Sequence, residues 1–225
     1  MIANRFRRHT SGDEIQGSAE HRSGDANAVD RTGSVSQAEE KASKTYFLFW
    51  AYLMTDLLMF AGLFAAFAVL RRNTFGGPGE QDIYQLPLVL AETFILLISS
   101  YTAGLAVYYA NRGKVKAVLG LLYTTGILGL SFLILELNEF ASLIREGNSF
   151  QRSGFLSSYF SLVGTHGLHI TAGLLWLTII LVFLMKRGLK GSMVRKITLF
   201  SMFWHFLDIV WIFIFSIVYL MGVSL

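Results

Sequence analysis

Residues 155–185 read FLSSYFSLVGTHGLHITAGLLWLTIILVFLM and contain no Asp, Glu, Lys or Arg. A bilayer core about 30 Å thick is crossed by roughly 20 apolar residues in a helix. Helix is also the only open structure that satisfies its own backbone polar groups in lipid. The stretch therefore predicts a transmembrane helix, long enough to tilt or to extend beyond the lipid.

Four further stretches are long and apolar enough to span a bilayer, and the chain of 225 residues is 53% hydrophobic. Its mean hydropathy is +0.51, which is high for a soluble domain. We predict an all-α fold, an integral membrane bundle of five transmembrane helices. Besides 155–185, the predicted spans are residues 46–70, 88–110, 117–140 and 197–221.

Residues 1–45 differ sharply from the rest, with seven basic and seven acidic side chains and no apolar run. Such a segment cannot bury enough apolar surface to offset its ordering entropy. It also lacks the apolar core of a signal peptide. We predict a disordered polar cytoplasmic tail over 1–45, followed by a transmembrane domain over 46–225.

The basic residues predict the orientation. Fifteen Lys and Arg fall in the tail and in the second and fourth loops, against four in the first and third loops. The positive-inside rule places the N-terminus in the cytoplasm and the C-terminus outside. This topology accounts for the pI near 9.4, so no nucleic-acid partner is predicted. Cysteine is absent, which excludes disulfides, thiolate metal sites and covalently attached c-type haem.

Ionisable side chains inside the spans are the candidate functional residues, because a charge in the bilayer core is costly. The rise per residue places Asp56, His169 and Asp208 within about one turn of the midplane. Glu92 and Glu136 both fall roughly 10 Å toward the outer side, with Glu139 beyond them. We therefore expect Glu92 and Glu136 to share one proton. The candidates are Asp56, Glu92, Glu136, Glu139, His166, His169, His205 and Asp208.

His166 and His169 share a helix face in the stretch GTHGLH, residues 164–169. One interpretation is a metal or haem site, with His205 as the ligand from an opposing helix. The other is a pair of histidines hydrogen-bonded to neighbouring helices, with the two glycines allowing close approach. Two histidines without a third ligand favour the structural interpretation, and no metal site is predicted.

The last span contains FWHFLDIVW, residues 203–211. His205 and Asp208 are three residues apart, and Trp204, Asp208 and Trp211 form a stripe at helical spacing. The pattern suits a proton relay or polar lipid site, or else a structural polar cluster between helices. Asp56 has no cation in its own span, so it is either a proton carrier or a protonated hydrogen-bond donor to another helix.

Three segments together resemble subunit III of the haem–copper terminal oxidases. They are YLMTD at 52–56 with LP at 86–87 and ETF at 92–94, the HGLH segment at 166–169, and WHFLDIVW at 204–211. The resemblance runs from about Tyr46 to the C-terminus and is strongest to the cytochrome o ubiquinol oxidase branch, whose members have five helices. Many cytochrome c oxidase members carry Glu where this chain has Asp56.

The resemblance implies a subunit without catalytic or metal-binding residues, because haem and copper belong to subunit I of that family. It implies partnership with subunits I and II and a small subunit IV, and bound phospholipid. It further implies a multi-pass protein of the bacterial inner membrane that supports assembly, stability and proton uptake.

Several alternatives remain open at this point. The quinol oxidised by the complex could be menaquinol, or its electron donor could be cytochrome c. A b-type cytochrome would use His166 or His169 with His205, and a small ion-coupled transporter would use Asp56 and Asp208. Stoichiometric haem in the purified chain would favour the cytochrome.

Overall fold

The computed structural model describes residues 40–41, 43–71, 86–147 and 153–220. The chain divides into two units, Met1–Ala51 and Tyr52–Leu225, and a helix over Ser43–Leu70 runs across their boundary. All regular secondary structure in the described ranges is helical. The remaining elements are α3 (Leu86–Asn111), α4 (Val115–Arg145), α5 (Gly154–Arg187), α6 (Gly191–Ile214) and a terminal π-helical turn, η1 (Phe215–Leu220).

The five predicted spans are confirmed, because the structure has five helices long and apolar enough to cross a membrane. Each predicted stretch corresponds to one helix, and most of the helices extend a few residues beyond the prediction. The fifth comprises α6 and η1 together, over Gly191–Leu220. The predicted tail lies almost entirely outside the described residues, so the domain boundary at 45–46 stays a prediction, as does the orientation in the membrane.

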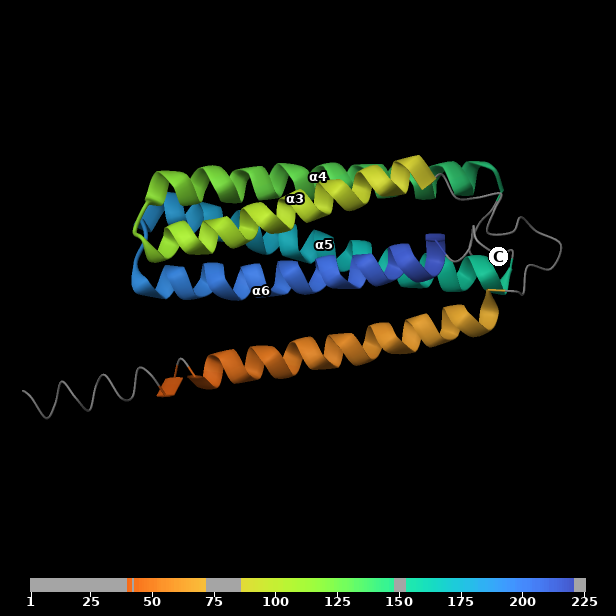
Figure 1. The fold of residues 1–225 in the computed structure, drawn as a ribbon, viewed down its shortest axis with the longest axis horizontal. Helices are drawn as coiled ribbons and strands as arrows, with labels where there is room; N and C mark the ends of the chain where they lie inside the picture. Colours follow the sequence, from red (N-terminus) through yellow and green to blue (C-terminus); the bar gives the residue numbers. More distant parts are fainter. Residues whose placement is uncertain (1–39, 42, 72–85, 148–152, 221–225) are drawn as a thin grey trace, which may run out of the picture. The chain divides into compact units, whose positions relative to one another are not determined.

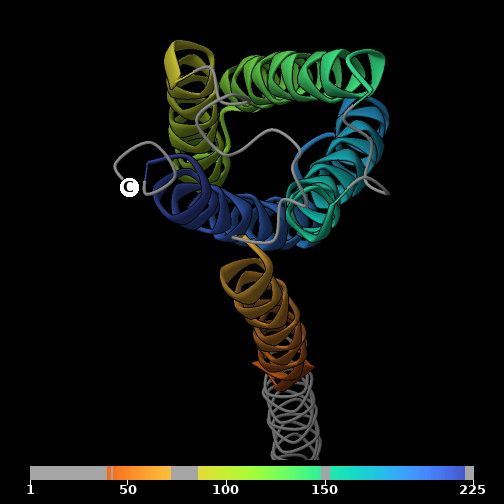
Figure 2. The same cartoon turned by 90° about the vertical axis from the view of Figure 1, so that its right-hand side faces the viewer.

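Helices α3 to α6 form a closed four-helix arrangement. Helix α3 packs against α4 and α6, and α5 packs against the same two helices, as the end-on view in Figure 2 shows. Consecutive helices run in opposite directions (Figure 1). The turn between α3 and α4 places Gly113 at φ 71°, and the end of α5 places Gly188 at φ 67°, where a residue without Cβ avoids strain.

Large aromatic side chains fill the interior of this bundle. Trp204 and Trp211 of α6 are almost completely buried, with exposed fractions of 1% and 0%. Trp204 lies against Gly129 of α4 and Gly173 of α5, where an added Cβ would come within 3 Å of its ring. Small residues therefore let these three helices approach closely around one indole, as is common where membrane helices pack.

Candidate functional site

Three carboxyl groups gather inside the bundle, near the ends of α3 and α4 that lie away from the turn joining them. Glu92 of α3 and Glu136 of α4 are 0% and 3% exposed, and Glu139 of α4 is partly buried. Glu136 interacts electrostatically with both of the others. The structure thus brings together the two glutamates that residue counting had placed at one depth.

Glu92 and Glu136 have no hydrogen-bond partner for any of their four carboxyl oxygens within the described part of the chain. Glu136 points toward α5, because a Cβ added to Gly167 would lie 3.0 Å from its Oε1. A buried carboxylate without a partner costs several kcal/mol. Burial without a hydrogen-bond partner therefore favours the protonated, neutral form of these carboxyl groups.

A hydrogen-bonded chain of two tyrosines extends from the third carboxyl. Tyr159 of α5 donates its hydroxyl proton to Glu139 Oε1 at 3.2 Å, and its oxygen lies 2.9 Å from the hydroxyl of Tyr219 in η1. A tyrosine has one proton to donate, so Tyr219 donates to Tyr159. Neither tyrosine was predicted as a site residue, since nothing in the local sequence around either one marks it.

His166 and His169 turn toward different neighbours. His166 is completely buried, with its ring 5.2 Å from that of Trp211 and 6.0 Å from that of Phe132. Nδ1 of His169 lies 2.8 Å from the Thr165 carbonyl oxygen. Because a carbonyl oxygen only accepts hydrogen bonds, Nδ1 carries the proton and donates it. The two rings therefore do not act as one chelating pair.

Asp56 has a partner that the sequence did not reveal. Its Oδ2 lies 3.7 Å from Nε2 of His169, although no cation lies in its own span. The distance is too long for a direct hydrogen bond, but it allows an ion pair when the imidazole is protonated. Asp56 thus faces His169 of α5 and also hydrogen-bonds Tyr52 of its own helix, and its role as proton carrier or hydrogen-bond donor stays a prediction.

The predicted stripe of Trp204, Asp208 and Trp211 lies along α3. Both indoles point into the bundle and donate their Nε1 protons to α3, at 3.0 Å to Ser99 and 3.1 Å to Thr93. Asp208 is only half-buried. Its Oδ1 is nevertheless buried, and it lies beside Ser100 of α3, so all three side chains of the stripe face α3.

His205 is exposed on the outside of α6. Its Nδ1 lies 2.6 Å from the Ser201 carbonyl oxygen. Its Nε2 lies over Gly104 of α3, since a Cβ added to that glycine would be 3.5 Å from Nε2. Asp208 interacts electrostatically with His205. His205 thus lies beside α3, whereas His166 lies in the interior. Among the residues that the structure describes, no three His, Cys, Asp or Glu side chains are grouped so that they could hold a metal ion.

Comparisons with known proteins cover most of the chain. A family model described as cytochrome c oxidase subunit III matches residues 32–223. The chain is 50% identical over 185 residues to cytochrome bo(3) ubiquinol oxidase subunit 3 of Pseudomonas aeruginosa, covering 82% of this chain and 88% of that protein. It is 46% identical to quinol oxidase subunit 3 of Bacillus subtilis over 176 residues, covering 78% and 86%. Cytochrome c oxidase subunit 3 of Bacillus sp. strain PS3 is 41% identical over 174 residues, covering 77% and 84%.

Proposed function

Because the chain belongs to the cytochrome c oxidase subunit III family, we propose that it is subunit III of a bacterial proton-translocating ubiquinol oxidase and carries no redox centre of its own. The observation that carries the proposal is the 50% identity to a ubiquinol oxidase subunit across 88% of that protein. Identity to the cytochrome c oxidase subunit is lower, at 41%. The balance of similarity therefore favours a quinol as the electron donor.

The described residues support an accessory role. The interior of the bundle is occupied by tryptophan and other aromatic rings, and its polar groups are dispersed over several helices. Haem and copper are expected in subunit I, so this chain would act on them only through the shape and electrostatics of the complex. Its proposed contribution is assembly, stability and support of proton uptake, with the carboxyl cluster as the group best placed to hold protons.

The proposed partners are oxidase subunits I and II, a small subunit IV and phospholipid, in the bacterial inner membrane. Large apolar side chains cover the outside of the helices; Leu168 of α5 is 69% exposed and Leu175 is 64% exposed. In a membrane such side chains face lipid or neighbouring helices. The exposed apolar surface therefore suits a subunit that is surrounded by lipid and by the helices of other subunits.

Affinity purification through a tag on this chain tests the proposal. Membranes solubilised in a mild detergent should yield a complex that contains haem and oxidises ubiquinol with oxygen. Reduced cytochrome c should be a poor donor for the same complex. Recovery of the chain without haem-bearing partners, or of a complex that oxidises cytochrome c and not ubiquinol, would contradict the proposal.

A further inference from the structure

An exposed histidine lies in the middle of a transmembrane helix. His205 falls halfway along the 30-residue span Gly191–Leu220, and its side chain is exposed on α6. The hydrocarbon core offers no hydrogen-bond partner, so polar side chains at this depth almost always face protein or a water-filled cavity. The isolated chain therefore leaves uncovered a group that needs covering in the membrane.

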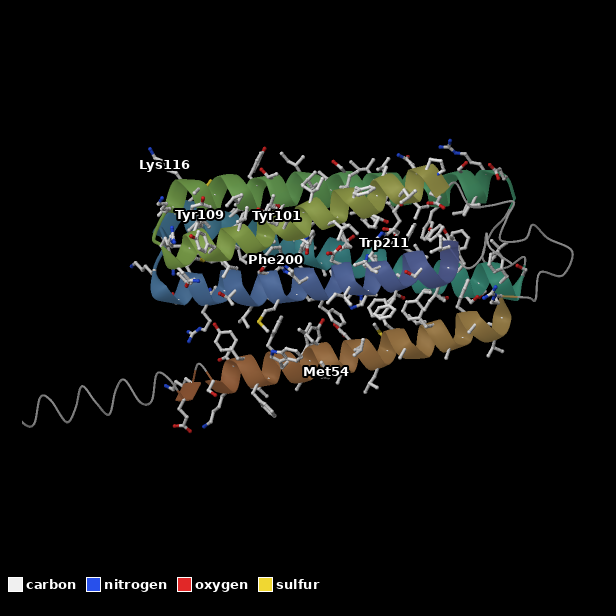
Figure 3. The ribbon with its side chains drawn as sticks, in the orientation of Figure 1. Met54, Tyr101, Tyr109, Lys116, Phe200 and Trp211 are labelled. Atoms are coloured by element: carbon white, nitrogen blue, oxygen red, sulfur yellow. The ribbon has the colours of Figure 1, made fainter. Side chains whose placement is uncertain are left out.

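A small patch lies where α3 meets α6: Nε2 of His205 lies over Gly104, and Asp208 lies beside Ser100. We call this patch the α3–α6 seam and define it as Ser100 and Gly104 of α3 with His205 and Asp208 of α6. Figure 3 shows α3 and α6, with Tyr101, the neighbour of Ser100 in α3, labelled. Tyr101 is 67% exposed and lies two residues from the middle of the span Pro87–Asn111.

The seam presents a hydrogen-bond acceptor at His205. Nδ1 of His205 donates its proton to the Ser201 carbonyl at 2.6 Å, so Nε2 of the neutral ring is an acceptor. Asp208 lies beside the Ser100 hydroxyl, and its Oδ1, which has no hydrogen-bond partner among the described residues, is buried within the chain. Gly104 has no side chain to hold a neighbour away from Nε2.

The chain's own first helix does not cover the seam. The part of that helix in the second unit contacts His169 of α5 through Asp56 and Phe213 of α6 through Phe64, with ring centroids 6.5 Å apart. His205 is exposed with this helix in place. Lipid does not cover the seam suitably either, because headgroups lie at the membrane interfaces and acyl chains form no hydrogen bonds.

We infer that the α3–α6 seam is the docking surface for a transmembrane helix of another oxidase subunit that presents a hydrogen-bond donor at mid-membrane depth. The inference rests on the proposed function and adds the face by which the chain binds its partner. Side chains that suit the seam are those of Arg, Lys, Asn, Gln, Tyr or Trp, since each donates to an imidazole nitrogen or a carboxyl oxygen.

Single-cysteine cross-linking tests the inference, because the chain has no cysteine of its own. Ile209 lies one turn beyond His205 on α6 and is 53% exposed. Ile134 is the matched control: it is 51% exposed, lies on α4, and is likewise about four residues past the middle of its span. Each of Ile209→Cys and Ile134→Cys is labelled with a photoactivatable maleimide in purified complex that oxidises ubiquinol.

We expect Ile209→Cys to give a covalent product between this chain and another oxidase subunit, in at least tenfold higher yield than Ile134→Cys. The inference is overturned if Ile209→Cys yields only lipid adducts, a dimer of this chain, or no more subunit product than the control. Because the assay begins with active complex, failure of the proposed function would appear earlier, as the absence of such a complex.

Substitution of the histidine gives an independent measurement. His205→Leu removes the Nε2 acceptor, whereas His205→Gln retains an acceptor of similar reach. We expect the Leu variant to dissociate from the detergent-solubilised complex at least tenfold more readily than the Gln variant. Circular dichroism of each released chain checks that it is folded. Equal retention of two folded variants would overturn the inference.

Discussion

The indole ring of Trp204 lies directly against the backbone of Gly129: a Cβ built on that glycine would stand 2.7 Å from Cζ2 of the ring. The ring also lies against Gly173, because a Cβ built on that glycine would be 2.9 Å from Cζ3 of the ring. The indole nitrogen donates to Ser99 of α3. The Trp204 side chain of α6 therefore contacts the other three helices of the bundle. Its indole ring fits only because Gly129 and Gly173 have no side chains.

Gly129→Ala should destabilise the bundle. The added methyl group cannot fit without moving a rigid, buried ring, and overpacking of this kind typically costs about 1–3 kcal/mol. Unfolding of the purified chain in detergent, followed by circular dichroism, measures the change. Gly120→Ala on the same helix is the control, because an added Cβ there meets nothing within 4 Å. Equal stability of the two variants would show that Trp204 is not confined as described.

The second indole supports a prediction about hydrogen bonding. Trp211 donates to the Thr93 hydroxyl at 3.1 Å between α6 and α3. Trp211→Phe and Thr93→Val each remove one partner, and a double-mutant cycle isolates their interaction. We expect a coupling of about 0.6 kcal/mol, the average for hydrogen bonds between membrane helices. Strictly additive effects would mean that the bond contributes nothing to stability.

The sequence predicted the helices well and the contacts between them poorly. The five spans follow from length and hydropathy alone, as does the common depth of Glu92 and Glu136, because a short turn joins two regular helices. Helices that are apolar on all sides give little indication of which face is inward. Helical spacing placed Trp204, Trp211 and Asp208 on one stripe, and all three contact α3, but the spacing did not indicate which helix the stripe would face.

Contacts between helices distant in sequence account for what the sequence missed at the site. The approach of Asp56 to His169 depends on how the first helix and α5 are rotated about their axes, which neither local sequence encodes. Tyr219 reaches Tyr159 from the π-helical turn η1, and π-helical turns have no reliable sequence signature. Both contacts become visible only when all five helices are in place.

Infrared spectroscopy should detect a protonated carboxyl group in the buried pair. Glu92 and Glu136 are buried and lack hydrogen-bond partners among the described residues, so at least one of them should be protonated at neutral pH. Either Glu92→Gln or Glu136→Gln should remove the carboxylic acid band. Glu146→Gln serves as the control, since Glu146 is exposed at the end of α4. A band that survives both substitutions in the pair would show that the proton lies elsewhere.

The orientation in the membrane is open to direct test. The fifteen-to-four distribution of Lys and Arg predicts a cytoplasmic N-terminus and an external C-terminus. A periplasmic reporter fused after Leu225 should be active, and the same reporter inserted at Lys190 should be inactive. A cytoplasmic reporter at the two positions should give the opposite result. Activity of the periplasmic reporter at Lys190 alone would mean that the topology is inverted.

The central claim is that this chain is an oxidase subunit without a redox centre, and the haem absorbance of separated subunits tests it most directly. The purified complex would be treated with detergent until this chain dissociates, and the spectrum of each fraction recorded. We predict that the Soret band and initial ubiquinol oxidation remain with the other subunits, and that the released chain shows no haem absorbance. A stoichiometric Soret band in the released chain would contradict the account.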